Sequence, residues 1–211
     1  MSPAGPPAPR KAPRRTRPAW LDRDNRFEGS GLSAGLTRLT TFFHDGARGN
    51  LVRIGRNFRT RGLVIAVRGE GNRIEIGDDV RFSGRIGLRG EGLTVRIGDR
   101  TDAKTTRIVA GGADVRIGAD CLIASGVRLR SGDLHAILER ATGRRLNPPE
   151  PVIVGDRVWL AAEAALMKGA RVPEGCVVGF RSTVMHGFDE PDCVLVGTPA
   201  RIARRGILWS R

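Results

Sequence analysis

The chain has 211 residues and a mass of 22.8 kDa, which is the size of one domain with a substantial core. No apolar run approaches the roughly 18 residues of a membrane span, so we expect no membrane-spanning segment. The 36 Lys and Arg residues outnumber the 22 Asp and Glu residues and give a formal charge of +14. This charge favours polyanions, acidic surfaces or phosphate-bearing ligands as partners, and it names no function by itself.

The three cysteines, Cys121, Cys176 and Cys193, lie at wide and unequal spacing. This spacing fits neither a disulfide framework nor a Cys-x-x-Cys metal knuckle, so we expect reduced thiols and a cytoplasmic location. The chain also has 29 Gly, no Tyr and only 5% aromatic residues, which is unusual for an α/β enzyme. Small residues must therefore matter for the geometry of the fold.

The first segment, residues 1–20, is rich in proline and basic side chains. Six of the 12 prolines and five basic residues fall within the first 18 positions, which contain no acid. This composition predicts a disordered basic arm, and it lacks the apolar stretch of a secretory signal. The arm is interpreted either as a solvated tail or as a segment that binds a polyanion.

Residues 21–50 are expected to form a short helical lead-in. Between positions 30 and 43, apolar residues recur at helical spacing, at Leu32, Leu36, Leu39 and Phe43. Asp45-Gly46 then offers a helix stop. We expect the apolar stripe of this amphipathic helix to cover one end of the core.

Residues 51–198 repeat, and residues 199–211 follow as a basic C-terminal tail. An Ile-Gly pair recurs at steps of 22, 21 and 20 residues, beginning at Ile54, Ile76, Ile97 and Ile117. Further along, aliphatic residues recur at a step of six, at Val154, Leu160, Leu166, Val172, Val178 and Val184. A helix would space its apolar residues by three and four and a strand by two, so this period fits neither.

A six-residue period fits a coil with flat sides, in which each side points one aliphatic residue toward the axis. Three such sides make about 18 residues per turn, and the longer upstream steps add corner residues. Stacked turns pair each other's backbone groups and leave open edges only at the two ends. The sequence therefore predicts an all-β fold, a parallel β-helix, whose hand the spacing alone does not set.

One histidine falls on this register. Ile117, Ile123 and Leu129 step by six, the next step lands on His135, and a polar loop over 139–152 then interrupts the repeat. A neutral imidazole near pH 7 can accept a proton from a hydroxyl that attacks an acyl carbonyl. His135 is therefore interpreted as a general base or as a corner histidine hydrogen-bonded to a loop carbonyl.

Two carboxylates, Asp133 and Glu139, flank this histidine. Either could hold the second ring nitrogen and stabilise the imidazolium, and the sequence does not decide between them. The other two histidines, His44 and His186, lie too far along the chain to join His135 on one coil. We therefore expect no metal site.

Four stretches carry a resemblance to a known family. They are LRSGDLHAILE at 129–139, TGRRLNP at 142–148, VGDRVW at 154–159 and VGTPAR at 196–201. Through them, from about residue 51 to 209, the chain resembles the left-handed β-helix acyltransferases of the hexapeptide-repeat superfamily, in particular the sugar and surface-polysaccharide O-acetyltransferase branch. The left hand of the coil comes from this resemblance.

The resemblance implies an acetyl-CoA-dependent O-acetyltransferase in which His135 deprotonates a sugar or polysaccharide hydroxyl that attacks the thioester directly. It also implies a homotrimer with active sites between subunits. Trp159 would flank the acceptor pocket or simply pack as a partly buried residue. The residues implied for coenzyme A binding are small or basic: Ala161, Ala162, Lys168, Gly179, Phe180, Arg181 and Arg201.

The chain departs from the family pattern at two positions. Ala161 stands where the family usually has glycine, and Phe180 stands where it has a small residue. Phe180 would narrow the thioester channel and favour acetyl over longer acyl groups.

Two other functions stay open beside the O-acetyltransferase. They are an N-acyltransferase acting on an amino sugar or small xenobiotic, and a non-catalytic scaffold or polyanion-binding protein. No specific nucleic acid partner is expected.

Overall fold

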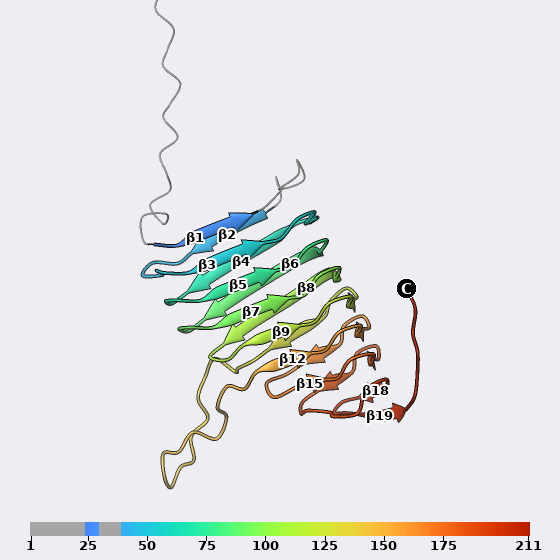
Figure 1. Cartoon of the computed structure of the whole chain (residues 1–211). Helices are drawn as coiled ribbons and strands as arrows, with labels where there is room; N and C mark the ends of the chain where they lie inside the picture. The colour runs from blue at the N-terminus through green and yellow to red at the C-terminus, as the bar shows by residue number, and fades with distance from the viewer. Residues whose placement is uncertain (1–23, 30–38) are drawn as a thin grey trace, which may run out of the picture.

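The computed structural model of the chain describes residues 24–29 and 39–211, and every regular element in these residues is a β-strand. The strands wind into a parallel β-solenoid whose turns stack from β1 (Arg26–Gly29) at one end to β19 (Ala200–Arg204) at the other (Figure 1). The all-β, parallel coil expected from the repeats is therefore confirmed. The described residues contain no helix that could cross a membrane.

One wall of the solenoid, wall 1, is a sheet of seven parallel strands. In spatial order these are β1 (Arg26–Gly29), β3 (Leu51–Ile54), β5 (Arg73–Ile76), β7 (Thr94–Ile97), β9 (Val115–Ile117), β12 (Val152–Val154) and β15 (Arg171–Val172). Its register places Ile54, Ile76, Ile97 and Ile117 in one row across successive turns. The Ile-Gly repeat thus marks one turn of the coil.

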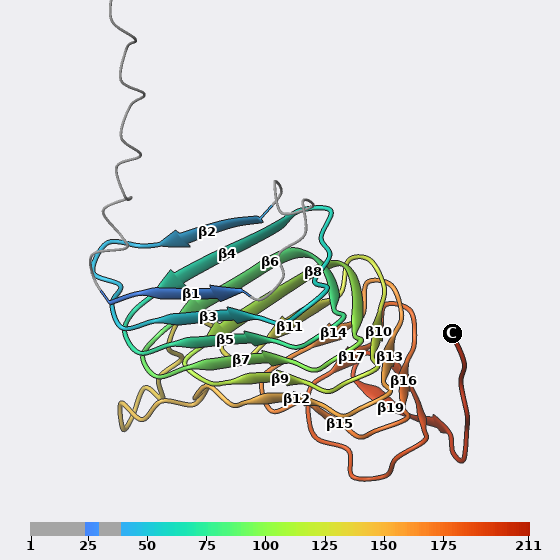
Figure 2. The same ribbon diagram turned by 45° about the horizontal axis from the view of Figure 1, so that its top comes forward.

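A twelve-stranded sheet forms the other two walls, because it bends within β6 (Arg81–Arg89) and β8 (Asp102–Gly111). Wall 2 holds the first residues of β6 and β8, then β10 (Leu122–Ile123), β13 (Trp159–Leu160), β16 (Val177–Val178) and β18 (Val194–Gly197). Wall 3 holds β2 (Leu39–Phe43), β4 (Leu63–Arg68), the rest of β6 and β8, β11 (Arg128–Arg130), β14 (Ala165–Leu166) and β17 (Thr183–Val184). Figure 2 shows the walls wrapping one interior.

The core is the interior of the coil. The six aliphatic residues at a step of six, from Val154 to Val184, are each at most 2% exposed. Turns pack so closely that a Cβ atom added to Gly98 would lie 2.5 Å from the backbone nitrogen of Ala119 on the next turn. The small residues at the corners of the sequence repeat are there because successive turns meet backbone to backbone.

The helix expected over 30–43 is wrong where the structure describes that segment. Residues 39–43 form β2, which pairs in parallel with β4 from Leu39 opposite Leu63 to Phe43 opposite Val67. Burial alternates along β2, as in a strand, and Leu39 and Phe43 pack against the core. Threonine and phenylalanine favour a strand, and the free edge of β4 supplies its partner. Residues 30–38 and the basic arm at 1–20 lie outside the described residues.

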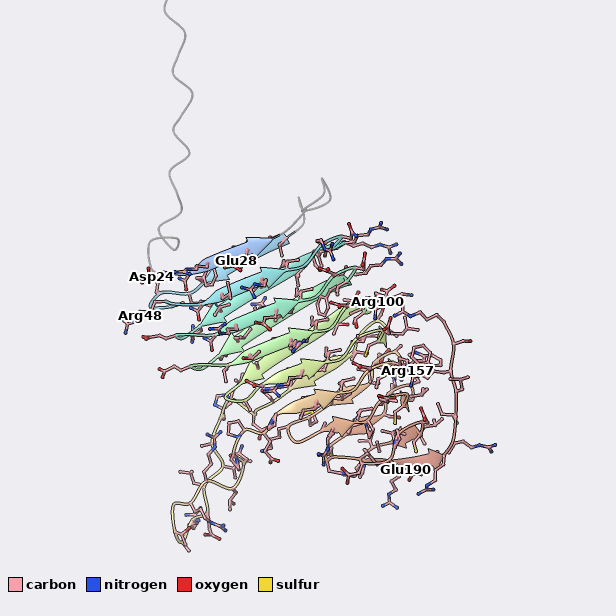
Figure 3. The ribbon with its side chains drawn as sticks, in the orientation of Figure 1. Asp24, Glu28, Arg48, Arg100, Arg157 and Glu190 are labelled. Carbon is pink, nitrogen blue, oxygen red and sulfur yellow. The ribbon has the colours of Figure 1, made fainter. Side chains whose placement is uncertain are left out.

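The C-terminal residues are not a free tail. Residues Ala200–Arg204 form β19, which runs antiparallel to β18, and the chain then turns back along the outside of the solenoid (Figure 1). The indole nitrogen of Trp209 donates to the peptide oxygen of Arg157 at 2.8 Å, and Arg211 donates to that of Arg100 at 2.8 Å. Arg100 and Arg157 lie on the side that faces this segment (Figure 3).

Candidate active site

A long loop, residues 131–151, leaves the solenoid between β11 and β12 and carries the three predicted catalytic residues (Figure 1). Its base is fixed at Ser131, which is fully buried. The Ser131 hydroxyl donates to the peptide oxygen of Ala113 at 2.6 Å and accepts from the amide of Gly111 at 3.0 Å. The Ser131 peptide oxygen accepts from the amide of Glu150 at 3.0 Å, which joins the two ends of the loop.

His135 lies on this loop and is exposed. The inward register ends at Leu129, and the coil resumes only at Val152, which is fully buried. The expectation that His135 occupies an inward aliphatic slot is therefore wrong, because the chain turns out of the coil at Ser131. Within the described chain the imidazole forms no hydrogen bond, so both ring nitrogens remain available to a substrate.

Asn147 holds the backbone around His135. Its side chain is buried, with 6% exposure, and its amide nitrogen donates to the peptide oxygen of His135 at 2.9 Å and to the Asp133 carboxylate at 2.9 Å. Its side-chain oxygen accepts from the amide of Ile137 at 2.6 Å. Sequence reasoning did not single out Asn147, although it lies in the TGRRLNP stretch, where asparagine directly before proline is a turn signal.

Asp133 is paired with Lys168, which lies on the turn after β14. Their charged atoms are 2.8 Å apart, and this bond, followed by the bond from Asn147, lowers the pKa of Asp133. Asp133 is thus ionised and fixes the loop to the solenoid. The structure joins Lys168 to the loop and not to the other residues predicted to bind coenzyme A.

Glu139 lies further out on the loop and is bound locally. Its carboxylate accepts a hydrogen bond from the Thr142 hydroxyl, and it lies 3.8 Å from the Arg144 guanidinium. None of its contacts within the described chain involves His135. Neither predicted carboxylate therefore touches the imidazole, and Asp133 reaches His135 only through Asn147.

Five of the seven residues predicted to bind coenzyme A meet on one edge, between walls 2 and 3. Ala161 and Ala162 sit one turn before Phe180 and Arg181, because the amide of Arg181 donates to the Ala162 peptide oxygen at 3.1 Å. Phe180 is 60% exposed, and the Arg181 guanidinium lies 4.9 Å from the centre of its ring. Gly179 completes the edge, and Arg201 lies on β19, opposite Val196.

The loop and this edge do not meet within one chain. The loop starts at the far end of wall 3, after β11, whereas Ala161 and Ala162 precede β14. Figure 2 shows the loop on one side of the solenoid and β13 and β16 on the other. Trp159 is also remote from the loop, because it lies on wall 2 with its ring 6.1 Å from that of Trp209.

A basic groove crosses wall 3 and ends at the loop. The groove has a volume of about 370 Å³, and Leu134, the residue before His135, is among the residues that line it. Sequence reasoning missed it, although some of its arginines recur at the period of one turn. The arginines that line it are Arg68, Arg85, Arg89, Arg107, Arg128 and Arg130.

Comparison with known proteins places this geometry in a family, although no family model matches the chain. The polysialic acid O-acetyltransferase of Neisseria meningitidis is 30% identical over 185 residues, which cover 77% of this chain and 86% of that protein. The polysialic acid O-acetyltransferase of Escherichia coli O1:K1 is 34% identical over 123 residues, which cover 57% of this chain and 39% of that protein.

Two solved structures have the same fold along nearly the whole chain. The polysialic acid O-acetyltransferase OatWY aligns with a TM-score of 0.74 and 27% identity, covering 88% of this chain and 92% of that one. The polySia-specific acetyltransferase NeuO aligns with a TM-score of 0.68 and 28% identity, covering 89% of each chain. The chain therefore belongs to the left-handed β-helix, hexapeptide-repeat acyltransferases, in the branch that contains the polysialic acid O-acetyltransferases.

Proposed function

We propose that this protein transfers the acetyl group of acetyl-CoA to a hydroxyl of a polysaccharide, with His135 as the general base. The observation that carries this proposal is an exposed imidazole with no hydrogen bond in the described chain, on a loop whose backbone Asn147 and Asp133 fix. The protein has three free, buried thiols, those of Cys121, Cys176 and Cys193. Free thiols fit a reducing compartment, so we propose that the reaction takes place in the cytoplasm.

In the proposed reaction, a ring nitrogen of His135 takes the proton of the acceptor hydroxyl as its oxygen attacks the thioester carbonyl. The carbon–sulfur bond then breaks, and the thiolate of coenzyme A takes the proton back from the imidazolium. The products are an acetyl ester and coenzyme A. Asp133 and Lys168 are positioning residues, because they hold the loop and do not touch the reacting atoms.

We propose that coenzyme A lies along the edge of Ala161, Ala162, Gly179 and Phe180. Small side chains and exposed backbone leave room for its pantetheine arm. Arg201 and Arg181 are the cations for its phosphates, and Arg181 would exchange its bond to Glu163 at 2.7 Å for a phosphate. The acetyl preference expected from Phe180 fits its 60% exposed ring on this edge. Trp159 is a weaker candidate for the acceptor pocket, because the C-terminal segment of the same chain approaches its ring.

We propose a homotrimer, because the loop and the coenzyme A edge lie on different edges of one chain. A three-fold assembly can place the loop of one subunit against the edge of the next. Mixing a His135→Ala chain with an Ala162→Trp chain tests this arrangement. Each variant alone is inactive, and randomly mixed trimers recover about one quarter of wild-type activity if each site uses two chains. No recovery from confirmed mixed trimers contradicts a shared site.

The function itself is tested by measuring release of free coenzyme A thiol with a panel of acceptors. We expect rapid release with polysialic acid, because two relatives act on it, and slow release with amino sugars or small amines. Faster release with an amine would favour the N-acyltransferase alternative. No release above background with any acceptor would contradict the proposed function.

A further inference from the structure

We propose that the arginine groove on wall 3 binds the acceptor as an extended anionic polysaccharide, with its carboxylates on successive turns and one hydroxyl delivered to His135. This inference rests on the proposed function, because it names the acceptor class of the same site. It assigns a binding surface to arginines that the proposed catalytic machinery does not use.

The register of wall 3 repeats the arginines once per turn. Arg85, Arg107 and Arg128 are directly opposite one another on β6, β8 and β11. Arg68 on β4 is opposite Arg89 on β6 in a parallel row. Neighbouring strands lie about 4.8 Å apart, so the groove presents a cation at each step along the solenoid axis.

These arginines form no ion pair in the described chain, although the charge of Arg130 contributes to the lowered pKa of Asp133. None of the six guanidinium groups forms an ion pair or a side-chain hydrogen bond there, and the Arg130 Nε is buried without a hydrogen bond. The residues outside the described part contain a single acidic side chain, Asp22. Like charges in register on neighbouring strands repel, so an unpaired row of them indicates a surface that an anion completes.

The floor between the two arginine rows is built from short side chains. It consists of Ala66, Gly87 and Val109, which are opposite one another on β4, β6 and β8. A Cβ atom added to Gly87 would approach no heavy atom closer than 3.9 Å. The small floor therefore comes from no steric requirement of the coil at Gly87, and it leaves room for sugar rings between two rows of cations.

The groove leads to the catalytic loop. Leu134 lines its end, and a second hollow shares Leu134, Arg68 and Arg89 with the groove and adds Arg145 from the loop itself. A chain that lies in the groove therefore reaches the segment that carries His135. Arginine side chains thus follow one another from four turns of the solenoid to the loop that carries His135.

The chemistry favours carboxylates of a polysaccharide over nucleic acid. Guanidinium groups bind carboxylates through two parallel hydrogen bonds, and a row of them matches an anion repeated along a polymer. Binding of single-stranded nucleic acid relies on aromatic side chains that stack with bases, and the groove lining contains none of Phe, Tyr or Trp. We therefore expect long acidic acceptors to bind far better than single acidic sugars or neutral polymers.

A pair of matched triple variants tests the proposal. Arg85→Gln/Arg107→Gln/Arg128→Gln removes three unpaired charges from the groove. Arg56→Gln/Arg100→Gln/Arg157→Gln removes three charges that are paired with Asp78, Asp120 and Glu174 on another edge. A third variant, Gly87→Val, fills the floor without changing charge. Circular dichroism and thermal melting establish that each variant is folded.

Steady-state kinetics give one readout. With polysialic acid fragments of increasing length, we expect the wild-type KM to fall with length and to rise with salt. The groove triple variant raises this KM at least tenfold and flattens the salt dependence, whereas kcat and the KM for acetyl-CoA stay within twofold. Gly87→Val raises the acceptor KM severalfold, and the paired-arginine variant changes it less than twofold. An unchanged acceptor KM in the folded groove variant, or a raised KM for acetyl-CoA instead, overturns the proposal.

Direct binding separates this proposal from the proposed function. Labelled polysialic acid fragments are titrated with wild-type protein and both triple variants, without acetyl-CoA, and followed by fluorescence anisotropy. We expect the groove variant alone to lose at least tenfold in affinity, and dextran and single-stranded DNA of equal length to compete poorly. Equal competition by DNA overturns the assignment to a polysaccharide. Groove-dependent binding without any acetyl transfer would contradict the proposed function, but it would still support the groove as a binding site for an anionic polysaccharide.

Discussion

Two sets of arginines on this solenoid differ in their partners. Wall 3 repeats arginine on successive turns, whereas on wall 1 Glu75 lies between Arg53 and Arg96. On wall 1 and its edge with wall 2, Arg53 binds Glu28 at 2.9 Å and Arg100 binds Asp120 at 2.7 Å. On wall 3, Arg85, Arg107 and Arg128 are also exposed and form no ion pair within the described residues. Ion pairs thus compensate Arg53 and Arg100, whereas the row on wall 3 has no such compensation. The lesson is that the pairing of charges, more than their number, locates a binding surface.

The largest expected effect separates chemistry from binding at the end of the groove. His135→Ala should lower kcat by about 10² to 10⁴-fold, because a general base is removed. The KM for the acceptor should change little, in contrast to the groove variants. His186→Ala is the matched control, since His186 is also exposed and lies on a different turn, where its ring contacts Phe188. Near wild-type kcat in folded His135→Ala would remove the assigned base.

A smaller effect is expected at the anchor of the loop. Asn147→Ala removes the donor to His135 and Asp133 and the acceptor for Ile137, which leaves partly buried groups without partners. We expect kcat to fall about tenfold, through a displaced His135. The measurement is kcat against KM. Asn147→Asp should give no rescue, because it keeps the acceptor for Ile137 but places a carboxylate oxygen against the Asp133 carboxylate and the His135 peptide oxygen. A fall in KM alone would show that Asn147 does not position the base.

The comparison also predicts opposite changes in stability. The groove triple variant relieves repulsion between arginines in register and should keep or raise Tm. The paired-arginine triple variant breaks three ion pairs with Asp78, Asp120 and Glu174 and should lower Tm slightly. Differential scanning calorimetry at low salt measures both. A larger loss of Tm in the groove variant would mean that those arginines serve the fold.

The smallest expected effect is the titration of Asp133. Its pKa is lowered in the folded chain, chiefly by the bond to Lys168, so the stabilisation of the fold is complete above the unfolded pKa of about 3.9. It is lost as the pH falls through the lower folded value. Carboxyl NMR should therefore give Asp133 a midpoint below about 3.9, and Lys168→Met should raise that midpoint. An unchanged midpoint in Lys168→Met would mean that the pair does not form in solution.

The coil could be predicted from the sequence because its narrow interior restricts the residue types at the inward positions. Each side of each turn must place an aliphatic residue toward the axis, so Val154 and Leu160 report the period directly. The residues proposed to bind coenzyme A came from the family resemblance. The spacing explains only why Ala162 and Phe180 share an edge, since they are one turn of 18 residues apart. Lys168 did not join that edge, because it lies past β14 on the next corner of the coil, where Asp133 binds it.

Other features depend on contacts that cannot be read from the spacing of residues in the sequence. Leu39 and Phe43 fit a helix and a strand equally, and pairing of β2 with the edge of β4 decides for the strand. The departure of the loop at Ser131 depends on hydrogen bonds to Gly111 and Ala113, so the register wrongly extended to His135. The groove was invisible for a similar reason. Its arginines form a surface only once the register of wall 3 is known.

The central claim is tested most directly by identifying the product on the polymer. Wild-type and His135→Ala proteins are incubated with acetyl-CoA and polysialic acid, and the polymer is examined by NMR before and after mild base. The account predicts base-labile acetyl ester on the wild-type product, in equal amount to the coenzyme A released, and at least about a hundredfold less with His135→Ala. Base-stable acetyl amide, or equal ester formation by the two proteins, would contradict it.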